Sequence, residues 1–150
     1  MKLALRWLLA WVAAVVVTAV LGSIVQTQFN LARIAALDGP VGLGNRLETT
    51  GFDLVSFAPT FAVIVALALL IAFVVAGALA RWIGRGRKIL FMLAGFAAIA
   101  AALAIMSAML PVTPIGATRS VTGFLTLSLT GAAAGWVYAE VMVNNPVSKN

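Results

Sequence analysis

Side chains that could do chemistry are scarce in this chain, and the most suggestive series follows Arg119. Steps of about 3.6 residues from Arg119 place three hydroxyls and one acid on the same helical face; these residues are Thr122, Thr126, Thr130 and Glu140. A stripe of hydroxyls could line a hydrated path through a membrane. Threonine hydroxyls in membrane helices also bond routinely to the carbonyl one turn back or to a neighbouring helix. The sequence leaves both interpretations open.

Arg119 and Ser120 form a candidate site for an anion or a carboxylate. They stand at the predicted start of a helix, where the macrodipole disfavours a cation but free backbone N–H groups attract an anion. The alternative is an ordinary ion pair between Arg119 and Asp53 or Glu48. The other members of this candidate binding surface are polar side chains predicted to lie on the same side of the membrane: Gln26, Gln28, Asn30, Arg46 and Asp53.

Two acids lie close to the ends of apolar stretches, Asp53 before one and Glu140 near the end of another. Ionisable groups near membrane depth are candidates for binding protons or cations. Pairing with a cation explains them more simply, and for Glu140 the expected partners are Arg6, Arg81 or Arg85.

The chain has neither cysteine nor histidine. Thiolate nucleophiles, thiolate or histidine ligation of zinc, histidine-ligated haem and Ser-His-Asp hydrolysis are therefore excluded. The glycines at 39, 42 and 44 lack the Lys-Ser/Thr that follows a phosphate-binding loop. We expect no catalytic residue, no metal site and no cofactor.

The elements that carry these residues must be membrane helices. The chain is 63% hydrophobic and 9% charged, with a mean hydropathy of +1.12, far outside the range of soluble domains. No charged residue occurs in 7–32, 54–80, 89–118 or 120–139, and a helix of about 20 residues crosses the hydrocarbon core. The predicted fold is one all-α membrane domain over residues 1–150, a four-helix bundle with spans near 4–25, 57–80, 89–110 and 120–142.

The first connection is predicted to be the longest, covering about 26–54. Residues 29–37 fit either an extension of the first helix or a separate interfacial piece, and Gly39-Pro40 ends that pattern. A second short amphipathic segment is expected after the bend. The second membrane helix is predicted to begin near Ala58-Pro59, with the proline in its first turn.

Seven of the ten Lys and Arg residues fall on one side of these spans, whereas three basic and three acidic residues fall on the other. The positive-inside rule then puts both termini and the 81–88 loop in the cytoplasm, in a bacterial inner membrane. These cations are expected to contact anionic lipids and not nucleic acid. Aromatic anchors at the same interface agree with this orientation: Trp7, Trp11, Trp82, Trp136 and Tyr138.

Gly131 and Gly135 form a small-xxx-small motif that favours close helix packing. The motif does not reveal whether its partner helix belongs to the same chain. The favoured hypothesis is a non-enzymatic structural or accessory subunit that binds another membrane protein through such faces and through the 26–54 segment. Two alternatives are an oligomeric channel or small-solute transporter lined by the threonines, and a lipid-binding protein or enzyme with a polar outer pocket. Membrane lipids, further copies of the chain and other membrane subunits are the expected partners.

Overall fold

The computed structural model describes residues 2–110 and 115–143, and this part of the chain is helical without strands. Its elements are α1 (Lys2–Asp38), α2 (Leu43–Ile83), α3 (Arg87–Met109), the short 3₁₀ helix η1 (Gly116–Arg119) and α4 (Val121–Val143). Each of the four α-helices is long and apolar enough to cross a bilayer. The prediction of an all-helical, multi-pass membrane protein is confirmed at this level.

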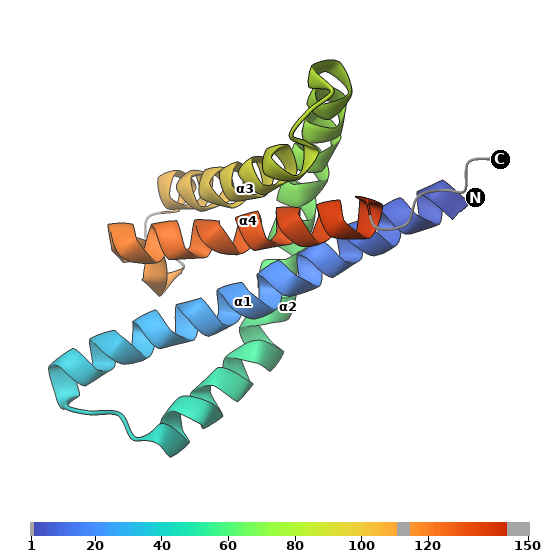
Figure 1. Ribbon diagram of the computed structural model, residues 1–150. Helices are drawn as coiled ribbons and strands as arrows, with labels where there is room; N and C mark the ends of the chain where they lie inside the picture. Colours follow the sequence, from blue (N-terminus) through green and yellow to red (C-terminus); the bar gives the residue numbers. More distant parts are fainter. Residues whose placement is uncertain (1, 111–114, 144–150) are drawn as a thin grey trace.

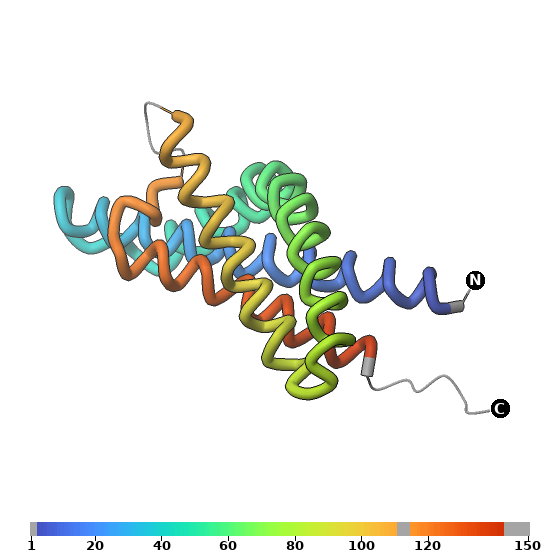
Figure 2. The backbone as a smooth tube through the Cα atoms, turned by 90° about the horizontal axis from the view of Figure 1, so that it is seen from above, coloured from blue at the N-terminus to red at the C-terminus, as the bar shows by residue number. Residues whose placement is uncertain are grey.

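The helices pack in the order in which they follow one another. α1 contacts α2 and α4, and α3 contacts α2 and α4 (Figure 1). α3 and α4 lie side by side and run in opposite directions in both views of the backbone (Figure 2). One end of the bundle therefore gathers the start of α1, residues 81–88 and the end of α4, and we call it the cationic end.

α1 and α2 are much longer than a membrane span. They contain 37 and 41 residues, or about 55 and 60 Å of helix at 1.5 Å per residue, against about 30 Å of hydrocarbon. The excess lies where the sequence predicted the 26–54 connection, with residues 29–37 either extending the first helix or forming a separate piece. α1 continues to Asp38 and α2 already begins at Leu43, so the 26–54 segment is a helical hairpin formed by the two long helices.

Pro59 shows why the start of α2 was predicted wrongly. It lies inside the helix and not in the first turn, so it removes one backbone donor and favours a bend. α2 changes direction along its course, with its first part following α1 and its second part rising away (Figure 1). A proline is tolerated inside a membrane helix where neighbours compensate for the lost bond.

The core is a narrow strip on each helix. Its members recur every four positions on α2 and α3: Phe61, Val65, Leu69 and Phe73 on the first, and Phe91, Gly95, Ile99 and Leu103 on the second. The outward faces are apolar as well, since Val63, Leu67 and Ile71 are 72, 63 and 60% exposed. Helices that are apolar on all sides fit a lipid environment.

Glycine determines how closely α3 and α4 approach. A Cβ atom on Gly131 would overlap the carbonyl oxygen of Gly95, and one on Gly135 would overlap that of Phe91. The helix that packs on the Gly131 and Gly135 motif is therefore α3 of the same chain. Backbones this close are typical of small-residue contacts in membranes.

Candidate functional site

A polar face of α1 is buried from the middle of the helix toward the end of the bundle that carries the 26–54 hairpin, which we call the hairpin end. Thr18, Ser23, Gln26 and Thr27 are each at most 6% exposed. The hydroxyls of Thr18 and Thr27 donate to carbonyl oxygens one turn back, at 2.9 Å. Gln26 was predicted from the sequence as a binding residue, whereas the three hydroxyl residues were not. The available signal was the spacing of four between Ser23 and Thr27, which puts both on one helical face.

Gln26 attaches η1 to α1. Its side-chain oxygen accepts a hydrogen bond from the buried backbone N–H of Ala117 at 2.9 Å. Arg33 reinforces the contact by donating to the carbonyl oxygen of Gly116 at 2.9 Å. The Asn30 side chain lies against Gly116 so closely that a Cβ there would overlap its oxygen. Two of the predicted surface residues, Gln26 and Asn30, thus hold the connection before α4 in place.

A second group of polar side chains joins the two arms of the hairpin. Arg46 donates to the side-chain oxygen of Gln28 at 3.2 Å, and the Gln28 amide donates to the Thr50 hydroxyl at 3.3 Å. The Thr27 hydroxyl also lies 2.6 Å from Asp53 Oδ2, so its single proton is shared between this carboxylate and the carbonyl oxygen of Ser23. The structure therefore brings Gln28, Arg46 and Asp53 into the same α1–α2 interface, where their partners are groups of the protein itself.

Ser120 caps α4 as predicted. Its hydroxyl oxygen accepts the backbone N–H of Gly123 at 3.1 Å, which is the usual N-cap geometry, and the Thr122 hydroxyl at 3.3 Å. Arg119 belongs to η1 and is exposed. Neither residue lines the two cavities described for this protein, and the same holds for the other members of the predicted surface. An anion at Arg119 stays a prediction.

The threonines of α4 form their hydrogen bonds locally. Thr126 donates to the carbonyl oxygen of Thr122 at 2.7 Å, and Thr130 donates to that of Leu127 at 2.6 Å. Thr122 is exposed, whereas Thr130 is buried. The three residues therefore meet different surroundings, and none of them lines either described cavity.

At the cationic end, side chains tie the helix ends together. Glu140 forms an ion pair with Lys88 at 2.5 Å, a partner outside the three arginines expected from the sequence. Arg6 donates to the carbonyl oxygens of Val141 and Met142 at 3.5 and 3.3 Å. A cation at these terminal carbonyls is favourable because the C-terminal end of a helix carries partial negative charge.

The predicted aromatic anchors divide into two kinds. Trp82 and Trp136 are 86 and 50% exposed, and Trp7 and Trp11 stack on each other with ring centroids 6.3 Å apart. Tyr138 differs, because it is only 2% exposed. The Tyr138 ring therefore belongs to the core at this end of the bundle, and its contact with headgroups stays a prediction.

Tyr138 is the centre of a three-ring cluster. Its ring lies 4.5 Å from that of Phe73 and 4.7 Å from that of Phe91, centroid to centroid, and the two phenylalanines meet edge-on at 5.6 Å. α2, α3 and α4 each supply one ring, so the cluster joins three helices. Aromatic pairs at these separations stabilise a structure beyond the area that they bury.

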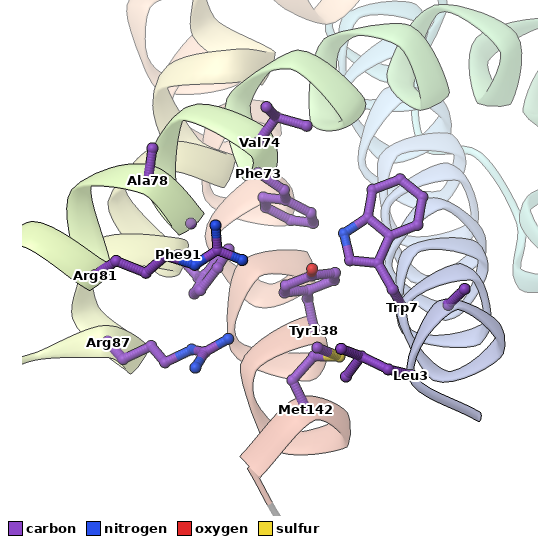
Figure 3. A pocket seen from close by; sticks show the side chains of 12 residues that line it. Leu3, Trp7, Phe73, Val74, Ala78, Arg81, Arg87, Phe91, Tyr138 and Met142 are labelled. Atoms are coloured by element: carbon purple, nitrogen blue, oxygen red, sulfur yellow. The ribbon is translucent and has the colours of Figure 1, made fainter. Parts of the chain in front are cut away.

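The cluster forms one wall of a cavity of about 710 Å³, here called the cationic cavity (Figure 3). Trp7 faces the cluster from α1, and the side chains of Arg81 and Arg87 extend toward it from α2 and α3. The Arg87 guanidinium carbon lies 5.7 Å from the centre of the Phe91 ring. Within residues 2–110 and 115–143, neither arginine has a carboxylate partner and the Tyr138 hydroxyl has no hydrogen-bond partner.

The described residues contain no group of three or more Asp, Glu, His or Cys that could hold a metal ion. Comparison of the chain with protein-family models, curated proteins and solved structures finds no match.

Proposed function

We propose that this protein is a non-enzymatic membrane subunit that binds another membrane protein through its 26–54 hairpin. The observation that carries the proposal is the way the hairpin distributes its side chains. Its polar groups bond to one another between the two arms, as described above, while large apolar side chains point outward. Leu47, Phe52 and Val55 are 69, 71 and 78% exposed.

The length of the helices makes this exposure significant. A span uses about 20 residues, whereas α1 and α2 have 37 and 41, so both reach well past the hydrocarbon. Apolar side chains gathered outside the hydrocarbon mark an interaction surface. Leu47 and Phe52 are five residues apart, which separates them by about 140° around the helix. A flat membrane surface would cover one side of α2 only, and a protein partner can cover both.

The Gly131 and Gly135 face named in the sequence-based hypothesis does not support binding of a partner. Gly131 and Gly135 already pack on α3, so this proposal rests on the hairpin alone. The alternative of a channel lined by Thr122, Thr126 and Thr130 gains no support from hydroxyls that bond within α4 and its cap.

Site-specific photocrosslinking tests the proposal in cells. A photoreactive amino acid is placed at Leu47 or Phe52, and at Val63 as a matched control on the same helix with equal exposure, 72%. We expect a discrete protein adduct from the two hairpin positions and none from Val63, which faces lipid within the span. The absence of a protein adduct at both hairpin positions would overturn the proposal.

The mass of the adduct identifies the kind of partner. The chain weighs 15.6 kDa, so an adduct of twice this mass that contains only this sequence indicates a second copy. Any other mass, followed by peptide sequencing, identifies a different subunit and supports the accessory role.

A further inference from the structure

The cationic cavity has positively charged side chains at its rim and apolar side chains along its wall. Arg81 and Arg87 bring two permanent positive charges to one rim, while Trp7, Phe73 and Val74 give the cavity an apolar wall (Figure 3). The Tyr138 hydroxyl completes the set as a donor on a side chain that is 98% buried, since only 2% is exposed. Arg81 and Arg87 are exposed, so they form a charged, water-accessible rim, and the Tyr138 hydroxyl beside them has no hydrogen-bond partner among the described residues. A charged rim above an apolar wall matches an amphipathic anion.

We propose that the cationic cavity binds one anionic membrane phospholipid, with its phosphate between Arg81 and Arg87 and its acyl chains along the wall formed by Trp7, Phe73 and Val74. The inference is independent of what the hairpin binds. It concerns the opposite end of the bundle and residues that the hairpin does not contact.

The headgroup end of the lipid fits the polar side of the cavity. Guanidinium groups bind phosphate oxygens with paired, charge-assisted hydrogen bonds. Tyr138 can donate a further hydrogen bond, and the Trp7 indole lies on the opposite wall at the level where such rings favour the headgroup region. Arg81 lies in the last turn of α2 and Arg87 is the first residue of α3, which places both cations at the end of a span, where lipid phosphates are found.

The size of the cavity agrees with this occupant. A volume of about 710 Å³ lies within the 300–1,000 Å³ of ordinary ligand sites, and it suits a headgroup and the first part of the acyl chains. The remaining methylenes would continue into the bilayer. A small inorganic anion would satisfy the arginines but leave the apolar wall uncovered.

Lipid counting by native mass spectrometry tests the proposal. The protein is transferred from mild detergent to nanodiscs of phosphatidylcholine doped with phosphatidylglycerol, released, and scored for retained lipid. We expect one retained phosphatidylglycerol on the parent. Arg81→Gln with Arg87→Gln should lower this retention about tenfold or more, because each cation near the phosphate contributes a severalfold effect.

Arg85→Gln is the matched control, since Arg85 lies in the same loop and is exposed but does not line the cavity. It should retain the lipid like the parent. Equal losses in the control and in the double variant would show attraction by general surface charge and would overturn a defined site. Displacement of the lipid by millimolar inorganic phosphate or glycerol phosphate would also overturn it, because the apolar wall would then contribute nothing.

A third variant tests the site without changing charge. Gly77 lines the cavity, and a Cβ placed on it has no neighbour within 4 Å. Gly77→Leu should therefore fold normally, fill part of the cavity and lower lipid retention severalfold. Its unfolding temperature in detergent is measured in parallel. A normally folded Gly77→Leu that retains phosphatidylglycerol like the parent would place the lipid elsewhere.

Discussion

The two ends of the bundle differ in whether polar side chains border a cavity. At the hairpin end, Gln28, Arg46 and Thr50 are bonded to one another, and Gln26 is bonded to the backbone of η1. At the cationic end, Arg81, Arg87 and the Tyr138 hydroxyl surround a cavity without partners in the described part of the chain. Polar groups bonded to other parts of the protein hold a structure together, whereas cations exposed beside a partly apolar cavity are available to a ligand. Scarce polar residues in an apolar chain therefore indicate function only once their partners are known.

The first test of this comparison determines which side of the membrane each end faces. Each cysteine should either react fully in intact cells or not react at all. The chain has no native cysteine, so single cysteines report cleanly. Gly42→Cys in the hairpin should react with an impermeant maleimide added to intact cells, and Arg85→Cys at the cationic end should react only after permeabilisation. Both positions are exposed. Labelling of Arg85→Cys alone in intact cells would reverse the orientation.

The largest difference in stability is expected between two glycine substitutions, one in a tight helix contact and one beside the cationic cavity. Gly135→Leu would drive a side chain into the backbone of α3 and should cost about 3 kcal/mol of unfolding free energy. Gly77→Leu, with open space around it, should cost nothing and could gain up to about 1 kcal/mol from higher helix propensity. Denaturant unfolding in micelles measures both. Similar losses in the two variants would mean that the cavity is closed in solution.

The next effect concerns the hairpin end. Gln26→Leu removes the acceptor of the buried Ala117 N–H, and an unsatisfied buried donor costs about 1–3 kcal/mol. Gln28→Leu is the matched control two residues away, where the partners are the side chains of Arg46 and Thr50. That loss should stay below about 1 kcal/mol, because both partners can find water. If Gln28→Leu lowers the unfolding free energy as much as Gln26→Leu, the hydrogen bonds of Gln28 with Arg46 and Thr50 stabilise the fold as strongly as the buried one.

The sequence was sufficient for the features that depend on local pattern. Uncharged stretches predicted four membrane helices, and the described residues form four helices long and apolar enough to cross a membrane. Charge placement grouped the start of α1, the 81–88 loop and the end of α4, and the contacts of Arg6 and Glu140 join these regions. Ser120 was recognisable as a cap because its hydroxyl needs only local partners.

Features that depend on distant partners were not predictable. The sequence left open whether α1 continues past residue 28, and it continues to Asp38 while α2 and η1 supply partners for its polar face. Pro59 resembled a first-turn proline, because no local pattern shows that residues 43–58 belong to the same helix. Tyr138 is an amphipathic residue near the end of an apolar stretch, which is typical of an interface anchor. Phe73 and Phe91 nevertheless bury its ring. Lys88 meets Glu140 only because α3 and α4 run antiparallel.

The smallest expected change in stability is at Tyr138, and it tests the comparison most directly. Tyr138→Phe keeps the ring contacts with Phe73 and Phe91 and removes only a hydroxyl that has no partner in the described structure. Its unfolding free energy in lipid-free detergent should stay within about 0.5 kcal/mol of the parent. The corresponding change at the hairpin end, Thr27→Val, removes a hydroxyl whose single proton is shared between Asp53 and the carbonyl oxygen of Ser23.

Thr27→Val leaves a carboxylate short of a donor, so it should cost about 1–3 kcal/mol under the same conditions. Added phosphatidylglycerol should then stabilise the parent more than Tyr138→Phe, because binding to the folded state alone raises its stability. A loss at Tyr138 as large as that at Thr27, without lipid present, would show that the hydroxyl already serves the fold. The two ends would then follow the same rule, and the case for a ligand at Tyr138 would fail.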